Sequence, residues 1–298
     1  MKPKLAPILF GLLALTLLIA CGGRPDKSVP GSSAAQTIEN KGSDTIVNLA
    51  LAWAEAYAEV RPEVRISVTG GGSGTGIAAM INGTVDIANA SRKMKPEEIE
   101  EARANGIEPV EHIIAGDAIA VVVHPSNPVD ELSIAQLADI FTGQITNWRE
   151  IGGPDRPIVL LSRESNSGTY VYFLERVVRE NIKKDDRLFS PDTLLMPSSE
   201  GISNEIRQNP NAIGYDGLGY VTHDQKTLCV VDKPGGPCVS PAVETVQNGS
   251  YPIARPLFMY TAGEPTGAIR EYLDWILGLE GQALVEELGF VPLGRTQP

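Results

Sequence analysis

Short apolar runs and longer amphipathic runs alternate along the chain from about residue 37. Strict alternation of apolar and polar positions, as in Val64–Val68, predicts a strand, whereas apolar positions three and four apart, as in Ile46–Val60, predict a helix. Trp53 and Tyr57 stand four positions apart in that helix, and we expect both in the core. Strands that alternate with helices indicate an α/β fold.

The same two patterns predict the other elements. Strands are expected at Val85–Ala88, Pro109–Ile114, Ala118–Val123, Ile158–Leu161, Ala212–Tyr215, Thr227–Val231 and Ile253–Tyr260. Helices are expected at Pro96–Ala104, Ser133–Phe141, Tyr170–Arg179, Ser199–Gln208, Pro265–Leu277 and Gly281–Leu288. The sequence shows no internal repeat, so it favours a layered fold rather than a repeat architecture.

Small hydroxylic residues and glycines gather where the chain enters three of these helices, at Lys41–Thr45, Gly70–Gly76 and Ser162–Thr169. Backbone N–H groups at a helix N-terminus lack intrahelical partners, and the helix dipole favours negative charge there. Arg163 adds a planar guanidinium that suits phosphate or carboxylate. One such junction is an ordinary helix cap, but three predict helix ends that converge on one anion.

Composition narrows the class of protein. The chain has 298 residues, which is enough for two domains. Its formal net charge of −12 argues against a nucleic-acid-binding surface. Helix dipoles and a single arginine can still bind a small anion on a negatively charged protein, because their effect is local.

The N-terminus predicts export. Lys2 and Lys4 precede the apolar stretch Leu5–Ala20, which is short for a membrane-spanning helix and typical of a signal peptide over residues 1–20. The end of this stretch, before Cys21, resembles a bacterial lipobox, in which the cysteine becomes the lipidated first residue. Residues 21–36 then form the lipidated cysteine and a flexible tether. A signal without lipid, or a simple membrane anchor, is the alternative.

The remaining two cysteines, Cys229 and Cys238, flank a Pro- and Gly-rich turn, and outside the cytoplasm they predict a disulfide. The three histidines His112, His124 and His223 are far apart and show no metal-ligand spacing. We therefore assign no metal and no cofactor.

Several motifs, in their order along the chain, resemble the phosphate-binding protein of the phosphate-specific ABC transporter, the PstS family. The resemblance runs from about Lys41 to Leu293. The motifs are Gly42–Thr45, Gly71–Gly76, Ala90–Arg92, Asp117–Val123, Ile140–Trp148, Arg163 with Ser167–Thr169, Ala212–Tyr215 and Gly289–Leu293.

The resemblance implies a periplasmic-binding-protein-like fold of type II, with two α/β domains, two hinge crossings and a ligand cleft that permits closure. Domain 1 would comprise residues 37–123 plus 250–298, and domain 2 residues 124–249. The implied partners are inorganic phosphate and the permease and ATPase subunits of a phosphate ABC transporter. The protein would be an extracytoplasmic monomer, anchored to the bacterial membrane by its lipid, with no nucleic-acid partner.

The resemblance also assigns phosphate-binding roles. Arg163 matches the phosphate-pairing arginine, and Asp117 is our choice for the carboxylate that accepts the proton of monohydrogen phosphate, with Asp44 as its rival. Such a carboxylate disfavours sulfate, which has no proton to donate. The family pattern departs at Asp44, where many members carry Ser or Thr, and at Arg92, where longer members carry Asp. The predicted phosphate-binding residues are Ser43, Thr45, Ser73, Ser91, Arg92, Asp117, Arg163, Ser167, Gly168 and Thr169.

Three alternatives remain open at this level. The protein could bind sulfate, molybdate or tungstate, or could be a surface adhesin or signalling receptor that uses the same domain. A phosphatase-like enzyme is disfavoured, because no histidine lies near a serine motif. Thr75 also breaks the nucleophile-elbow pattern, and Ile77 stands where a P-loop has lysine. We expect a binding protein and not an enzyme.

Overall fold

The computed structural model describes residues 36–294. The predicted signal peptide, Cys21 and all but the last residue of the tether lie outside this range. Within it, no helix is both long enough and apolar enough to cross a membrane.

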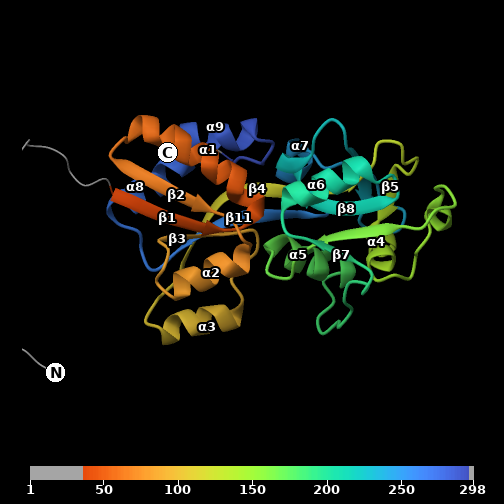
Figure 1. Cartoon of the computed structure of the whole chain (residues 1–298), viewed down its shortest axis with the longest axis horizontal. Coiled ribbons are helices and arrows are strands. Elements are labelled where there is room, and N and C mark those ends of the chain that lie inside the picture. Colours follow the sequence, from red (N-terminus) through yellow and green to blue (C-terminus); the bar gives the residue numbers. More distant parts are fainter. Residues whose placement is uncertain (1–35, 295–298) are drawn as a thin grey trace, which may run out of the picture. The chain divides into compact units, whose positions relative to one another are not determined.

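Strands and helices alternate as the sequence predicts (Figure 1). The strands are β1 Gln36–Gly42, β2 Val64–Thr69, β3 Ile87–Ala90, β4 Val110–Val123, β5 Glu131–Ser133, β6 Val159–Arg163, β7 Leu194–Met196, β8 Ala212–Gly217, β9 Lys226–Val231, β10 Cys238–Val239 and β11 Ala254–Thr261. The α-helices are α1 Asp44–Val60, α2 Ser73–Ile81, α3 Pro96–Ala104, α4 Ile134–Phe141, α5 Gly168–Phe173, α6 Ser199–Gln208, α7 Val243–Gln247, α8 Gly267–Leu277 and α9 Leu279–Glu287. Two 3₁₀ segments, η1 Trp148–Ile151 and η3 Leu218–Tyr220, and the π-helical η2 Leu174–Val178 complete the described part.

The strands form one mixed sheet in the order β2-β1-β3-β11-β4-β8-β6-β7, and β9 joins its middle through β4. β4 is the longest strand, and it pairs first with β11 and then with β8 and β9. Its residues 110–118 lie antiparallel to β11, and residues 119–123 lie antiparallel to β8. Because one strand serves both, β4 links the two ends of the sheet.

Two apolar clusters pack on opposite faces of the strands around β1 and β3. Helices α1, α8 and α9 cover one face and helices α2 and α3 cover the other (Figure 1). Successive side chains of a strand point to opposite faces of the sheet. Ile87 therefore packs in the first cluster and its neighbour Ala88 in the second. Trp53 and Tyr57 are buried in the first cluster, as predicted.

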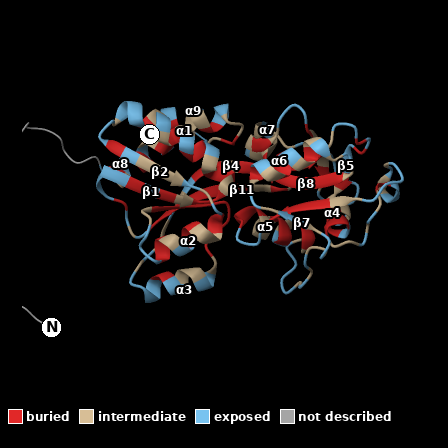
Figure 2. Ribbon diagram, viewed as in Figure 1, coloured by how far each residue is buried: buried red, intermediate tan, exposed pale blue. Residues whose placement is uncertain are grey.

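Two further clusters pack on the strands around β8. One gathers residues of α4, α5 and η2, and the other gathers residues of α6. β4 again alternates, since Val121 faces the first cluster and Val122 the second. Figure 2 shows β4 and β8 largely buried between these layers. The chain passes between the two pairs of clusters along β4 and returns along β11, and the domain bounds proposed from the sequence stay a prediction.

The elements β1, β5, β7, β10 and α7 were not among those predicted, and two predicted elements differ clearly in extent. The separate strands expected at Pro109–Ile114 and Ala118–Val123 are the single strand β4. Ala115–Asp117 interrupts the apolar alternation, but pairing with β11 and a bridge from Gly116 to Val291 keep this segment extended. The helix expected at Tyr170–Arg179 begins earlier, at Gly168, and changes to π-helical geometry at Leu174.

The predicted disulfide joins Cys229 of β9 to Cys238 of β10, which are antiparallel neighbours. The cysteines are separated by 9 positions. Closing a loop of that length in the unfolded chain stabilises the protein by about 2–3 kcal/mol in the chain-entropy description. The bridge therefore fixes a surface hairpin, and the prediction from the turn sequence is confirmed.

Candidate functional site

The three predicted junctions are the N-termini of α1, α2 and α5. Their N-cap residues are Ser43, Gly72 and Ser167. The Ser167 side chain accepts a hydrogen bond of 3.2 Å from the Thr169 N–H, so this residue is also an ordinary cap. Because each helix follows a strand of the same sheet, the three N-termini can meet at one place.

Five buried hydroxyls from these junctions and from the end of β3 form a hydroxyl cluster: Ser43, Thr45, Ser73, Ser91 and Thr169. Ser91 connects the other two serines, since its Oγ lies 3.0 Å from Ser43 Oγ and 3.3 Å from Ser73 Oγ. Thr45 Oγ1 and Thr169 Oγ1 are 2.8 Å apart. The bond between Thr45 and Thr169 joins residues 124 positions apart, and all five residues of the cluster are ones that the sequence predicted for the site.

Gly168 brings α5 against α2 and the end of β3. A Cβ at this position would overlap Ser73 Oγ and Ser91 Oγ, and it would lie 3.1 Å from the Ser91 carbonyl carbon. Only glycine allows this approach, so any larger residue would push the N-terminus of α5 away from the serines. The sequence placed Gly168 at the site for the same reason, close backbone approach.

A buried ion pair stands next to the hydroxyl cluster. Arg255 Nη2 and Nε donate to Asp117 Oδ2 at 2.9 and 3.1 Å, and neither side chain reaches solvent. Arg255 Nη2 also donates to Thr169 Oγ1 at 2.9 Å, and its Nη1 donates to the Ser91 carbonyl at 2.9 Å. Arg255 therefore connects the predicted acceptor Asp117 with both halves of the cluster.

The other predicted arginine, Arg163, is equally buried. Its Nη2 donates to Asp44 Oδ2 at 2.8 Å and its Nη1 to Ser199 Oγ at 3.0 Å. Asp44 Oδ1 accepts a 2.9 Å hydrogen bond from the Gly71 N–H. Asp44, the rival acceptor, thus holds Arg163 at the N-terminus of α1 and ties that N-terminus to the loop before α2.

Unlike the other predicted site residues, Arg92 pairs with a residue of α3. Its Nη1 and Nη2 donate to the two carboxylate oxygens of Glu98 at 2.8 and 2.6 Å. A Cβ at Gly74 would lie 3.8 Å from Arg92 Nη2, so the guanidinium is near the first turn of α2. The structure places Arg92 at the edge of the site, paired with α3.

Reasoning from the sequence missed two charged residues here, Arg255 and Asp216. Arg255 lies within the apolar strand β11, and Asp216 within the apolar strand β8. Charged residues are almost never fully buried unless paired. A lone charge in an apolar strand is therefore the signal that could have identified both.

Asp216 is buried at the N-terminus of α6. Its Oδ1 accepts hydrogen bonds from Ser199 Oγ at 2.8 Å and from the Gly217 N–H at 2.9 Å. Its Oδ2 is buried and has no hydrogen-bond partner among the described residues. Desolvation raises the pKa of Asp216 to about 6, while the charge of Arg163 acts against this shift. Burial likewise raises the pKa of Asp117, and Arg255 opposes it.

Asp216 is expected to make stability fall as pH rises from about 4 to about 6. Its pKa is about 6 in the folded protein against an ordinary 3.8, so in this window the folded state binds more protons than the unfolded state. Asp216→Asn cannot ionise, and the loss of stability between pH 4 and pH 7 should shrink by about 2 kcal/mol. Urea unfolding at both pH values measures it. Asp192→Asn, at an exposed carboxylate, is the control, and an equal pH dependence of Asp216→Asn and wild type would contradict the assignment.

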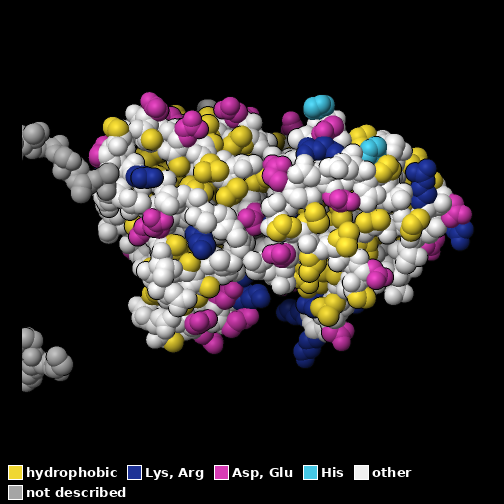
Figure 3. All heavy atoms as spheres, viewed as in Figure 1, with side chains coloured by type: hydrophobic (Ala, Val, Ile, Leu, Met, Phe, Trp, Pro, Cys, Tyr) yellow, Lys and Arg dark blue, Asp and Glu magenta, His cyan; other side chains and the backbone are white. Residues whose placement is uncertain are grey.

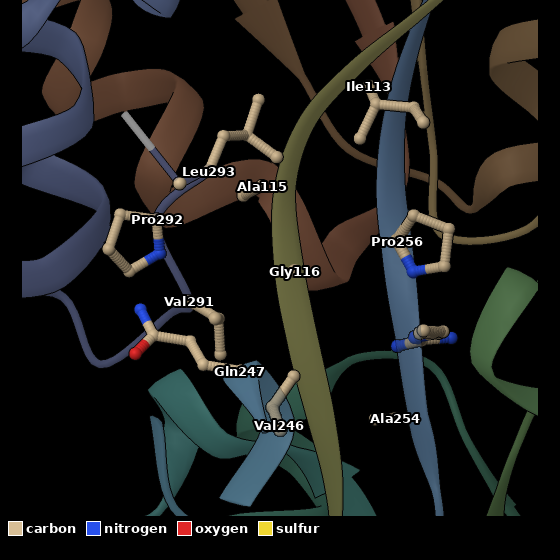
Figure 4. A pocket seen from close by; sticks show the side chains of 12 residues that line it. Ile113, Ala115, Gly116, Val246, Gln247, Ala254, Pro256, Val291, Pro292 and Leu293 are labelled. Atoms are coloured by element: carbon tan, nitrogen blue, oxygen red, sulfur yellow. The ribbon is translucent and has the colours of Figure 1, made fainter. Parts of the chain in front are cut away.

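A cavity of about 600 Å³ lies elsewhere on the two connecting strands, between β4, β11 and the segment before the C-terminus (Figure 4). Its walls include Ile113, Val246, Pro256, Val291 and Leu293. Gln247 and Arg255 also line it, but most of its walls are apolar, and the Arg255 guanidinium already donates to Asp117, Thr169 and the Ser91 carbonyl. Acidic side chains lie at several separate places on the face seen in Figure 3, so the surface there offers no broad basic area. The hydroxyl cluster, which the buried Arg255 contacts directly, is the better anion site.

Comparison with known proteins agrees with this fold. The PBP superfamily domain matches residues 28–280. The phosphate-binding protein PstS of Pseudomonas aeruginosa is 32% identical over 279 residues, covering 88% of this chain and 84% of the relative. PstS of Bacillus subtilis is 32% identical over 300 residues, covering 98% and 95%. A crystal structure from Clostridium perfringens, of a candidate phosphate ABC transporter substrate-binding protein with bound phosphate, has a TM-score of 0.78 at 33% identity and covers 87% of this chain and all of that one.

The α/β arrangement is that of the PBP superfamily. Within it, the chain belongs to the PstS family of phosphate-binding proteins. The predicted fold class, an α/β periplasmic-binding-protein-like fold, is thereby confirmed.

Proposed function

We propose that this protein binds inorganic phosphate outside the cytoplasm and delivers it to the permease and ATPase subunits of a phosphate ABC transporter. The observation that carries the proposal is the convergence of the hydroxyl cluster on Arg255 and Asp117. Hydroxyls and arginines donate to the anion's oxygens, and a buried carboxylate accepts its proton. The phosphate-binding relatives support the same ligand.

The contacts within the cluster also indicate how a ligand would enter. Thr45 in α1 and Thr169 in α5 hydrogen-bond directly to each other. A phosphate held by both hydroxyls would take the place of that bond, so α1 and α5 have to separate and then close again on the ligand. This is the closure that we propose for the two domains, and binding energy shared by both sides would favour the closed state.

Calorimetric titration of the purified protein with phosphate, sulfate and molybdate tests the ligand. Phosphate is expected to bind most tightly. Arg163→Ala should weaken phosphate binding at least about tenfold, because hydrogen bonds to charged groups contribute about 1.5–3 kcal/mol. Arg149→Ala, which removes an exposed arginine, is the matched control. Tighter binding of sulfate or molybdate would instead indicate a binding protein for another oxyanion. If Arg163→Ala binds phosphate as tightly as the wild type, Arg163 does not contact the ligand.

We also propose that Cys21 carries the lipid anchor. The support is the sequence at the end of the apolar N-terminal stretch, since Cys21 lies outside the described residues. A Cys21→Ser variant made in the native host should leave the membrane fraction and keep its phosphate affinity, because the tether separates the anchor from the folded part. Cell fractionation and titration check both, and a membrane-bound variant would contradict the anchor.

A further inference from the structure

Three carboxylates lie at or beside the hydroxyl cluster, and two of them are paired with arginines. Asp117 accepts two hydrogen bonds from the Arg255 guanidinium. Asp44 accepts a hydrogen bond of 2.8 Å from Arg163. A positive partner at hydrogen-bonding distance favours the ionised form of a carboxyl group. The charges of Asp117 and Asp44 are therefore compensated within the protein.

Asp216, the third carboxylate, has no such partner among the described residues. Its Oδ1 accepts hydrogen bonds from the Ser199 hydroxyl and the Gly217 N–H, which are both neutral donors. Its Oδ2 is buried without a hydrogen-bond partner among those residues, and the residue is only 1% exposed. Burying a charge without a paired cation is costly. Asp216 is therefore the carboxylate of the three that gains most from taking up a proton.

Asp216 is connected to the site by two short routes. Ser199 Oγ donates to Asp216 Oδ1 and accepts a hydrogen bond of 3.0 Å from Arg163 Nη1, so one hydroxyl bridges the carboxylate and the predicted phosphate-pairing arginine. A Cβ at the neighbouring Gly217 would lie 3.2 Å from Thr45 Cγ2, so the end of β8 lies against the hydroxyl cluster. An anion bound by Arg163 and the cluster would therefore act on Asp216 through buried protein.

The groups around Asp216 do not balance an incoming anion. The charged and titratable side chains that face it are Arg163 of β6, Asp117 of β4, Tyr220 of η3 and the exposed Glu200 of α6, with Asp44 and Arg255 as the partners of Arg163 and Asp117. Burial raises the pKa of Tyr220, so this phenol stays neutral. The two arginines face three carboxylates, which leaves this group of side chains at a net charge of −1 when all are ionised. A phosphate dianion adds to that negative charge, and nearby like charges disfavour the ionised form of a carboxyl group.

We infer that Asp216 takes up a proton from solvent when phosphate binds, so that the carboxylate without a cationic partner becomes neutral as the anion enters. The proton forms an O–H bond at Asp216 and no other bond changes. In the empty protein burial raises the pKa of Asp216 to about 6, so the group is ionised at pH 8 until the anion arrives. The inference rests on the proposed phosphate site and adds to it a residue that acts on the ligand by its charge rather than by contact.

Proton uptake gives the phosphate affinity a defined pH dependence. Above about pH 6 the empty wild type has to be reprotonated at Asp216, which lowers its affinity by up to about tenfold for each pH unit. Asp216→Asn cannot ionise, and its amide oxygen can still accept from Ser199 and Gly217. The variant should therefore bind phosphate about tenfold or more tightly than the wild type at pH 8, and within about twofold of it at pH 5.5. Both proteins meet the same mixture of phosphate ions, so the ratio of their affinities cancels the titration of phosphate itself.

Calorimetric titration at pH 8 in two buffers of different ionisation enthalpy counts the protons directly. Free phosphate is mostly the dianion at this pH, so protons that are taken up on binding go to the protein. The wild type should take up about half a proton or more per phosphate beyond the number for Asp216→Asn. Asp192→Asn, which removes an exposed carboxylate, is the matched control and should behave as the wild type.

The outcomes separate this inference from the proposed function. If Asp216→Asn and the wild type take up equal numbers of protons, or keep one affinity ratio at pH 5.5 and pH 8, the inference is overturned. Equal weakening by Asp216→Asn at both pH values would also overturn it, because Asp216 would then only hold Ser199 and Arg163 in place. If the variant does not fold, the wild type decides, since binding at pH 8 without proton uptake overturns the inference. Failure of the wild type to bind phosphate at either pH would instead overturn the proposed function.

Discussion

Arg255→Ala is expected to lower the free energy of unfolding by about 3–5 kcal/mol, because it leaves the charge of Asp117 buried without its partner. Both side chains of this pair are inaccessible to solvent, and Asp117 Oδ2 receives two hydrogen bonds from the guanidinium. The same substitution removes the donors to Thr169 and to the Ser91 carbonyl. Urea unfolding at pH 7 measures the change.

Arg149→Ala is the control for this experiment. Arg149 pairs with Asp155 at the surface, where both side chains are more than half exposed. Removing an exposed pair should change stability by no more than about 1 kcal/mol. If Arg255→Ala costs no more than this control, the buried pair does not hold the site together. The double variant Arg255→Ala, Asp117→Ala should cost less than the sum of the single variants, because the second change removes the unpaired charge.

Asp117→Asn is expected to reduce the ratio of phosphate to sulfate affinity by up to about 10⁴-fold, the discrimination that a buried acceptor can provide. Asp117 Oδ1 makes only a 3.3 Å hydrogen bond, from the Leu218 N–H, so it retains the capacity to accept a proton from the ligand. A Cβ at Gly217 would contact both Asp117 Oδ1 and Thr45 Cγ2, which places this oxygen beside the cluster. An amide would donate where the carboxylate accepts.

Calorimetry at one pH and one salt concentration gives the ratio for each variant. Asp44→Asn is the competing test, because both oxygens of Asp44 already accept hydrogen bonds, from Gly71 and from Arg163. A ratio that is unchanged in Asp117→Asn but collapses in Asp44→Asn would make Asp44 the acceptor. If neither variant changes the ratio, selectivity does not depend on either carboxylate, and another oxyanion becomes the better ligand.

The sequence by itself determined the features that depend on neighbouring residues. Apolar spacing located α1 and placed Trp53 and Tyr57 in the core. The small residues at three helix entries identified Ser73, Gly168 and Thr169, because a helix N-terminus and its cap are local structures. The turn between Cys229 and Cys238 indicated their disulfide for the same reason.

Tertiary structure alone decided which charges meet. Arg255 and Asp117 are 138 positions apart, and Arg163 and Asp44 are 119 apart. No local pattern pairs such residues, since their contact depends on the register in which β11 lies beside β4 and on the approach of α1 to β6. The continuity of β4 through Ala115–Asp117 likewise comes from its partner strand, which supplies hydrogen bonds where the apolar alternation is interrupted. A buried charge is stable only where the fold brings an opposite charge or a donor to it, and that is a property of the assembled sheet rather than of any segment.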